Sequence, residues 1–304
     1  MNKIFTVKLL VCAVILLTAA NVFAQKRAAV KQTKKPIIFA VLNDGARLEP
    51  IAHIEKGKLT ETAGGDADEK VLTDFTKSFY QPKAAYRLVF GGADAGTVTV
   101  KSSNPKSDCG KNMADAAVQS PKAKLKGMVM GLATDAPIGK GSGVRRLPTA
   151  AERAEIESLV RAELTKQKVA PDAVKNLKYH NLTALDVDAD GAIEMVGSFW
   201  VETSSTERAL LFFIADKNKS GKYSFGFSEH KTVKQSDVMS GEIKDLDGGV
   251  YHELLLDVFD YDADGAGEIF TYVQSFEGAG FNAYRRAGGK WTKTFEGSNY
   301  HCGY

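Results

Sequence analysis

Short apolar runs, separated by turn residues such as Gly, Asn and Asp, dominate the chain from Pro36 onward. Runs of this length predict β-strands, and in the first half of the chain they fall at 37–42, 51–54, 86–90, 97–100 and 125–132. The apolar side chains of residues 66–80 recur at helical spacing instead, as Leu72, Phe75 and Phe79 do. We therefore expect residues 36–134 to form a small α+β domain, in which one helix packs on an antiparallel sheet.

The next two segments predict a linker and then a helix. Residues 135–148 are rich in Gly and have Pro near both ends, which is typical of a linker. Within them, Gly139–Gly143 lacks the G-x-x-x-x-G-K-[ST] spacing of a phosphate-binding loop, so we expect a flexible turn. Residues 149–167 predict a helix, because Thr149 and Glu152 have the spacing of a capping box and an apolar stripe follows them.

The last part of the chain repeats one unit: a strand, an acidic loop, a second strand and a hairpin. The two acidic loops begin at Asp186 and Asp260, which are 74 residues apart (260 − 186). We expect an internal duplication, and residues 149–304 to form a helix followed by a duplicated antiparallel β domain. The predicted fold class is thus α+β and rich in β structure.

Both acidic loops read D-x-D-x-D-G-x-x-E. Carboxylates at alternate positions repel one another unless a cation lies among them, and the Gly supplies the positive φ that folds the loop back. Oxygen ligands with this spacing are typical of a Ca²⁺ site. An EF-hand is not expected, because its twelfth position requires Glu whereas Gly197 and Thr271 stand there, and because both loops are flanked by β-forming residues.

The stretch from Thr183 to Val196 resembles the FG-GAP or VCBS-type repeat of integrin-like β-propellers, and the resemblance covers residues 182–296 only. In that family the side chains at loop positions 1, 3, 5 and 9 and the carbonyl at position 7 bind Ca²⁺. The resemblance therefore implies two ligand sets, which are Asp186, Asp188, Asp190, Ala192 and Glu194 in the first loop and Asp260, Asp262, Asp264, Ala266 and Glu268 in the second.

The chain departs from that family in two respects. Ala189 and Ala263 stand where Gly is common, and position 9 is Glu rather than Asp. Because a propeller requires four or more blades, two repeats predict an open or sandwich-like sheet instead. The alternative interpretation is that both loops are acidic β-turns without an ion. The related stretch that begins at Asp216 is predicted to be a hairpin tip, and the acidic turn at 245–249 is assigned no ligand.

The N-terminus predicts export from the cytoplasm. Residues 1–24 read as a signal peptide with a cut after Ala24, the alternative being an uncleaved anchor, and residues 25–35 read as a disordered linker. Two cysteines then remain, Cys109 and Cys302, and in an oxidising compartment we expect them to form a disulfide rather than two buried thiols. A periplasmic or secreted protein without a further membrane span is expected.

Two functions stay open at the sequence level. The formal charge of +3 falls to about +1 without Lys3 and Lys8 of the leader, which gives no reason to expect nucleic acid as a partner. The five histidines are scattered without metal-binding spacing, and no G-x-S-x-G motif is present. We favour a module that binds an extracellular protein or glycan and is stabilised by Ca²⁺. A Ca²⁺-dependent hydrolase of an extracellular polymer is the alternative.

Overall fold

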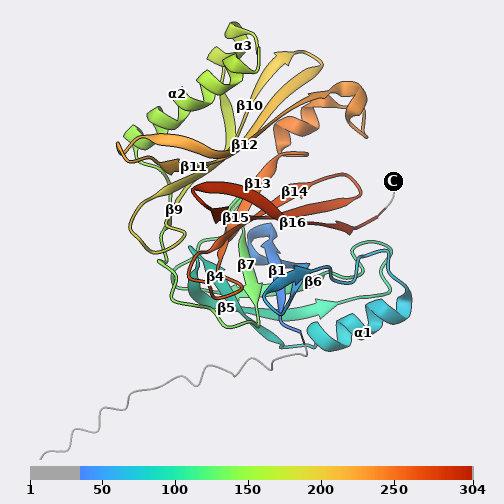
Figure 1. Cartoon of the computed structure of the whole chain (residues 1–304). Helices are drawn as coiled ribbons and strands as arrows, with labels where there is room; N and C mark the ends of the chain where they lie inside the picture. Colours follow the sequence, from blue (N-terminus) through green and yellow to red (C-terminus); the bar gives the residue numbers. More distant parts are fainter. Residues whose placement is uncertain (1–34, 303–304) are drawn as a thin grey trace, which may run out of the picture.

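A computed structural model describes residues 35–302 of the chain. Three β-sheets of seven, four and five strands are stacked in that order (Figure 1). Two helices cover the outer face of the five-stranded sheet, and one helix lies beside the seven-stranded sheet. The predicted signal peptide and almost all of the predicted linker at 25–35 lie outside the described residues. No helix within residues 35–302 is long and apolar enough to cross a membrane.

The N-terminal part is a closed barrel. Its strands follow the order β1-β7-β4-β5-β6-β2, and β1 pairs with β2 to close the ring, while β3 extends β2 as a hairpin. The bounds of these strands are β1 Ile37–Leu42, β2 Arg47–Glu55, β3 Lys58–Thr60, β4 Ala85–Phe90, β5 Ala93–Ser103, β6 Ala114–Gln119 and β7 Gly131–Thr134. The helix predicted within residues 66–80 is present as α1 (Glu69–Phe79). Its Phe75 and Phe79 belong to the barrel core.

Strand β1 contributes side chains both to the barrel core and to the core between the barrel and the four-stranded sheet. Every residue of β1 is buried. Ile37, Phe39 and Val41 pack inside the barrel, whereas Ile38 and Ala40 belong to a second core shared with the four-stranded sheet. A strand buried on both faces reads as a continuous apolar run, which is the pattern of residues 37–42.

Two sequence expectations for this part are too simple. The sheet is a closed barrel, because the unpredicted strand β6 bridges β5 and β2. The strand expected at 125–132 begins only at Gly131 and runs to Thr134, so the two ranges share residues 131 and 132 alone. A turn bonded from the Val129 N–H to the Lys126 carbonyl, with Gly127 at a φ of +61°, interrupts the earlier residues.

The five-stranded sheet lies under the two outer helices. Its order is β12-β11-β10-β9-β8, with bounds β8 Arg145–Arg146, β9 Lys178–Leu185, β10 Glu194–Ser204, β11 Glu207–Lys217 and β12 Tyr223–Lys234. Helix α2 (Ala150–Lys166) begins with the predicted capping box, in which the Thr149 hydroxyl accepts from the Glu152 N–H at 3.2 Å. The stripe Ile156, Val160 and Leu164 packs on this sheet, and the short unpredicted helix α3 (Pro171–Lys175) completes the layer.

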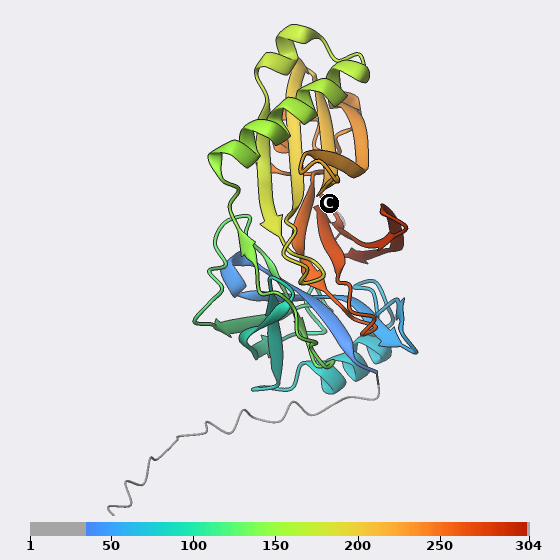
Figure 2. The ribbon, with the colours of Figure 1, turned by 60° about the vertical axis from the view of Figure 1, so that its left-hand side comes forward.

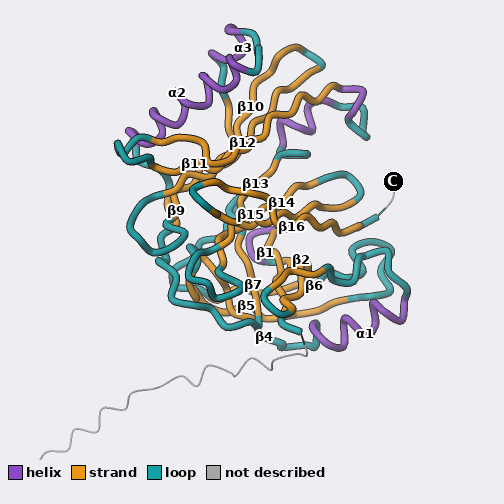
Figure 3. Tube along the Cα trace, viewed as in Figure 1, coloured by secondary structure: helices purple, strands orange, loops and turns teal. Residues whose placement is uncertain are grey.

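The four-stranded sheet is the middle layer (Figure 2). Its strands follow one another as β13 Glu253–Phe259, β14 Glu268–Gln274, β15 Gly278–Ala287 and β16 Lys290–Tyr300. One face packs on the five-stranded sheet through Val258, Ile269 and Tyr284, and the other packs on the barrel. The four-stranded and five-stranded sheets pack face to face as a sandwich, which is one of the two arrangements expected, and they do not form a propeller. In both sheets the acidic loop joins the first two strands of an antiparallel meander, β9 to β10 and β13 to β14 (Figure 3).

The predicted linker makes specific contacts. Arg145 donates to Asp257 of β13 at 2.6 Å, and both side chains are almost fully buried. Asp257 also accepts the N–H groups of Gly91 and Gly92 at the tip of the β4–β5 hairpin, each at 3.1 Å. A Cβ on Gly141 would lie 2.0 Å from the Gly92 carbonyl oxygen, so glycine is required for this approach. The segment thus joins the barrel to the two sheets.

The C-terminal end of β16 is fixed to the barrel. Cys109 and Cys302 form the predicted disulfide. Beside it, the buried Glu49 carboxylate of β2 accepts from the Asn299 amide at 2.9 Å and lies 2.5 Å from the His301 ring nitrogen. A covalent link and polar contacts therefore fasten the end of β16 to the barrel.

Candidate metal centre

The two acidic loops share one backbone conformation. We call residues 186–194 the first acidic loop and residues 260–268 the second. The fourth position is left-handed in both, with φ of +59° at Ala189 and +62° at Ala263. The sixth position is left-handed as well, with φ of +83° at Gly191 and +93° at Gly265. The predicted role of the glycines is confirmed, and the alanines adopt the conformation that Gly favours at the same place.

Carboxylates at positions 1 and 5 shape each loop by accepting backbone hydrogen bonds. In the first loop Asp186 accepts from the Gly191 N–H at 3.3 Å, and Asp190 from the Ala192 N–H at 2.6 Å. In the second loop Asp260 accepts from the Gly265 N–H at 3.0 Å, and Asp264 from the Ala266 N–H at 2.9 Å. The N–H group at position 7, Ala192 or Ala266, thus donates to the position-5 carboxylate in both loops.

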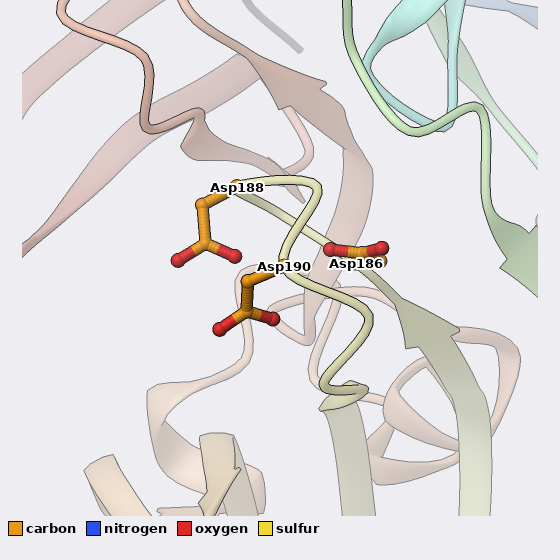
Figure 4. A group of neighbouring side chains, drawn as sticks. All are labelled: Asp186, Asp188 and Asp190. Atoms are coloured by element: carbon orange, nitrogen blue, oxygen red, sulfur yellow. The ribbon is translucent and has the colours of Figure 1, made fainter.

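The first loop gathers three predicted side chains. Asp186, Asp188 and Asp190 each place one oxygen within 4.8 Å of the others, and all three project from the same loop (Figure 4). Glu194 lies outside this trio. Its carboxylate accepts from the Val187 N–H at 3.1 Å and from an arginine at 3.2 Å.

The second loop gathers a different trio. Asp260, Asp262 and Glu268 each place one oxygen within 4.8 Å of the others. Asp264 is the predicted carboxylate that lies outside this group. The position-9 glutamates, Glu194 and Glu268, are both only 1% exposed.

Two arginines that the sequence analysis did not single out complete the clusters. Arg286 of β15 contacts Asp188, Glu194 at 3.2 Å and Asp216 at 3.3 Å. Arg285, its neighbour, contacts Asp262 and donates from Nε to Glu268 at 2.7 Å. The sequence signal for them was the pair of adjacent arginines in a predicted strand. Side chains of adjacent strand residues point to opposite faces, so one arginine can reach each cluster.

Asp216 also belongs to the first cluster, although the sequence indicated only a hairpin tip. It lies near the end of β11 (Glu207–Lys217) and accepts from the Trp291 indole at 3.0 Å as well as from Arg286. A Cβ on Gly226 would lie 2.3 Å from the Asp216 carboxylate, so glycine at that site makes room for it.

Several carboxylate oxygens in the two clusters remain unsatisfied among the described residues. They are Asp186 Oδ1, Asp188 Oδ1, Asp262 Oδ1 and Glu268 Oε2, all buried and without a hydrogen-bond partner. Burial raises the pKa of Glu194 and of Glu268 to about 7 in each case, despite hydrogen bonds and an arginine that act in the opposite direction. Buried anionic oxygens without a partner are costly, so each cluster can accommodate a further cation.

The two loops lie side by side. The Gly267 N–H donates to the Val187 carbonyl at 2.9 Å. A cavity of about 110 Å³ lies between the loops and the connecting segment, lined by Asp186, Asp188, Asp260 and Lys140. Ser142 of that segment donates to the Asp186 carbonyl at 2.6 Å, so the predicted flexible turn is held against the first loop.

Comparisons with known proteins give no family. No family model matches the chain, and neither the curated proteins nor the solved structures contain a significant match.

Proposed function

We propose that the protein is a periplasmic or secreted calcium-binding module, in which each acidic loop holds one Ca²⁺ and the ions stabilise the stacked sheets. In this proposal the first ion is bound by Asp186, Asp188, Asp190, Glu194 and the Ala192 carbonyl. The second is bound by Asp260, Asp262, Asp264, Glu268 and the Ala266 carbonyl.

The observation that carries the proposal is the set of unpartnered, buried carboxylate oxygens in both loops. The first cluster contains five carboxylates against Arg286, and the second contains four against Arg285. One guanidinium leaves a large negative excess in each cluster. The donors are all oxygen, which favours Ca²⁺ or Mg²⁺ over the transition metals, and the flexible mixture of carboxylates and carbonyls suits Ca²⁺.

The FG-GAP or VCBS resemblance supports the loop part of this proposal only. It suggests a domain that presents its surface to an extracellular protein or glycan. The disulfide between Cys109 and Cys302 favours an oxidising compartment, in line with the predicted signal peptide.

Calorimetric titration of the mature protein with CaCl₂ tests the proposal, together with melting temperatures in Ca²⁺ and in chelator. We expect two binding events and a higher melting temperature in Ca²⁺, since a ligand bound only by the folded state stabilises it. Asp188→Ala and Asp262→Ala should each remove one event.

Two controls accompany the titration. Asp172→Asn changes an exposed aspartate of α3 and should leave both events intact. MgCl₂ in place of CaCl₂ reports selectivity. Equal melting temperatures in Ca²⁺ and chelator, with no heat of binding, would sink the proposal.

A further inference from the structure

Each acidic loop already contains a cation of the protein's own, and it occupies the same two loop positions in both copies. Arg286 contacts Asp188 at position 3 and Glu194 at position 9. Arg285 contacts Asp262 at position 3 and Glu268 at position 9. The carboxylates at positions 1 and 5 accept backbone N–H groups in both loops, and Asp264 at position 5 also lies 4.0 Å from Arg285.

The strand geometry of β15 makes this double contact possible. Side chains of consecutive strand residues point to opposite faces. Tyr284 and Arg286 face the five-stranded sheet, where Tyr284 packs with Phe212. Arg285 lies on the other face and reaches the second loop of its own sheet. One dipeptide thereby supplies one guanidinium to each cluster.

The guanidinium satisfies only part of each position-3 carboxylate. In both loops one oxygen of that residue contacts the arginine, whereas the other, Asp188 Oδ1 or Asp262 Oδ1, is buried without a partner. A divalent ion in the loop would draw on the same carboxylates at positions 3 and 9. Two cations that share these ligands repel each other and compete for the same lone pairs.

We propose that Arg285 and Arg286 are built-in counter-cations that hold the ion-free loops and lower their affinity for Ca²⁺. This inference rests on the proposed function. Ion binding then shifts each guanidinium away from positions 3 and 9, and the arginines set the Ca²⁺ concentration at which the loops fill.

The two arginines differ in what they join. Arg285 contacts residues of the β13–β14 loop, within its own sheet. Arg286 connects the four-stranded sheet to three carboxylates of the five-stranded sheet, at Asp188, Glu194 and Asp216. Through Arg286, filling of the first loop is therefore coupled to the contact between the sheets, whereas Arg285 provides no such link for the second loop.

The test uses variants in which a single loop can titrate. In an Asp262→Ala background, where the first loop alone binds, Arg286→Gln should tighten Ca²⁺ binding by at least about tenfold. Arg285→Gln should have no comparable effect there. In an Asp188→Ala background the roles should reverse. Arg286→Lys and Arg285→Lys, which keep the charge, should remain close to the wild-type affinity.

A second readout is the melting temperature in chelator. Both Gln variants should melt below the wild type, because the ion-free carboxylates lose their counter-charge, and Arg286→Gln should lose more because it spans two sheets. Saturating Ca²⁺ should restore both. Lys70→Gln, at an exposed position of α1, serves as a remote control and should change neither readout.

The outcomes separate this inference from the proposed function. If the wild type binds Ca²⁺ and the Gln variants bind it equally or more weakly, the arginines are positioning residues and the inference is wrong. If only the Gln variants bind, the inference stands and the wild type is not a calcium protein under those conditions. If no variant binds Ca²⁺, both proposals are wrong.

Discussion

Ala189 and Ala263 hold a left-handed backbone at the fourth position of the acidic loops. For an alanine this conformation costs about 1 kcal/mol relative to glycine. The same conformation at Gly191 and Gly265 costs little, and a Cβ on either glycine would meet no atom within 4 Å. At Gly191 and Gly265, backbone conformation alone therefore decides the effect of a substitution by alanine.

We predict that Ala189→Gly and Ala263→Gly each stabilise the protein by about 0.5–1 kcal/mol, whereas Gly191→Ala and Gly265→Ala each destabilise it by about 1 kcal/mol. Urea unfolding in chelator measures these values without the contribution of an ion. Gly248→Ala is the matched control, since its Cβ would also lie in open space but its φ is not left-handed. A similar loss in Gly248→Ala would contradict the conformational explanation.

His252 is a buried base whose titration affects stability. It is 1% exposed, both ring nitrogens have no hydrogen-bond partner among the described residues, and burial lowers its pKa to about 3. The groups that face it are His180, Trp200, the Leu246 carbonyl and Asp247. Below pH 6.5 the unfolded chain binds a proton at this residue and the folded protein does not, so stability falls as the pH drops.

We predict that the wild type loses on the order of 2–3 kcal/mol at this residue between pH 7 and pH 4, and that His252→Phe removes this part of the loss. Chemical unfolding at a series of pH values measures it. Parallel stability curves for the two proteins across this range would show that His252 does not titrate as described.

Among the elements, the connecting segment at 135–148 has the most consequential contacts. Arg145 of β8 is buried against Asp257, whereas its neighbour Arg146 is paired with Glu152 at 2.8 Å and is 38% exposed. Removing one partner of a buried ion pair leaves an uncompensated charge, and an exposed pair contributes little. Two adjacent arginines thus provide a direct comparison.

We predict that Arg145→Met destabilises the protein by about 3–5 kcal/mol and Arg146→Met by at most about 1 kcal/mol. Guanidinium-induced unfolding compares them. The double variant Arg145→Met/Asp257→Asn, which removes both charges and keeps an oxygen that can accept from the Gly91 or Gly92 N–H, should recover part of the loss. Equal effects of the two single variants would mean that the segment is a passive linker.

At the scale of the whole molecule, the disulfide joins residues 193 positions apart in sequence. A crosslink over a chain of this length removes much entropy from the unfolded state, roughly 5 kcal/mol in the simplest loop-closure treatment and commonly less in practice. It acts at the end of β16, where Asn299 and His301 also contact the barrel.

We predict that the Cys109→Ser/Cys302→Ser variant is destabilised by about 2–5 kcal/mol, and that reducing agent lowers the stability of the wild type to a similar value. Melting curves with and without reductant check both statements. The Ser variant should not respond to reductant, and a response would point to an effect other than the disulfide.

The sequence by itself determined the local features. Spacing of apolar residues and the Thr149–Glu152 capping box placed α2, and the Gly positions fixed the fold of both acidic loops. These features depend on neighbours within a few residues, so the chain order specifies them directly. The pairing of Cys109 with Cys302 was also predictable, because two cysteines leave one simple choice.

Only the tertiary structure decided what lies around those loops. Closure of the barrel depends on β6 bridging β5 and β2, and a strand of mixed polarity such as Ala114–Gln119 gives little signal of its own. Arg286 reaches Asp188 across 98 residues of sequence. Ligand spacing within a loop is local, whereas the counter-charges come from β15, and sequence distance contains no information about which face of a distant strand meets them.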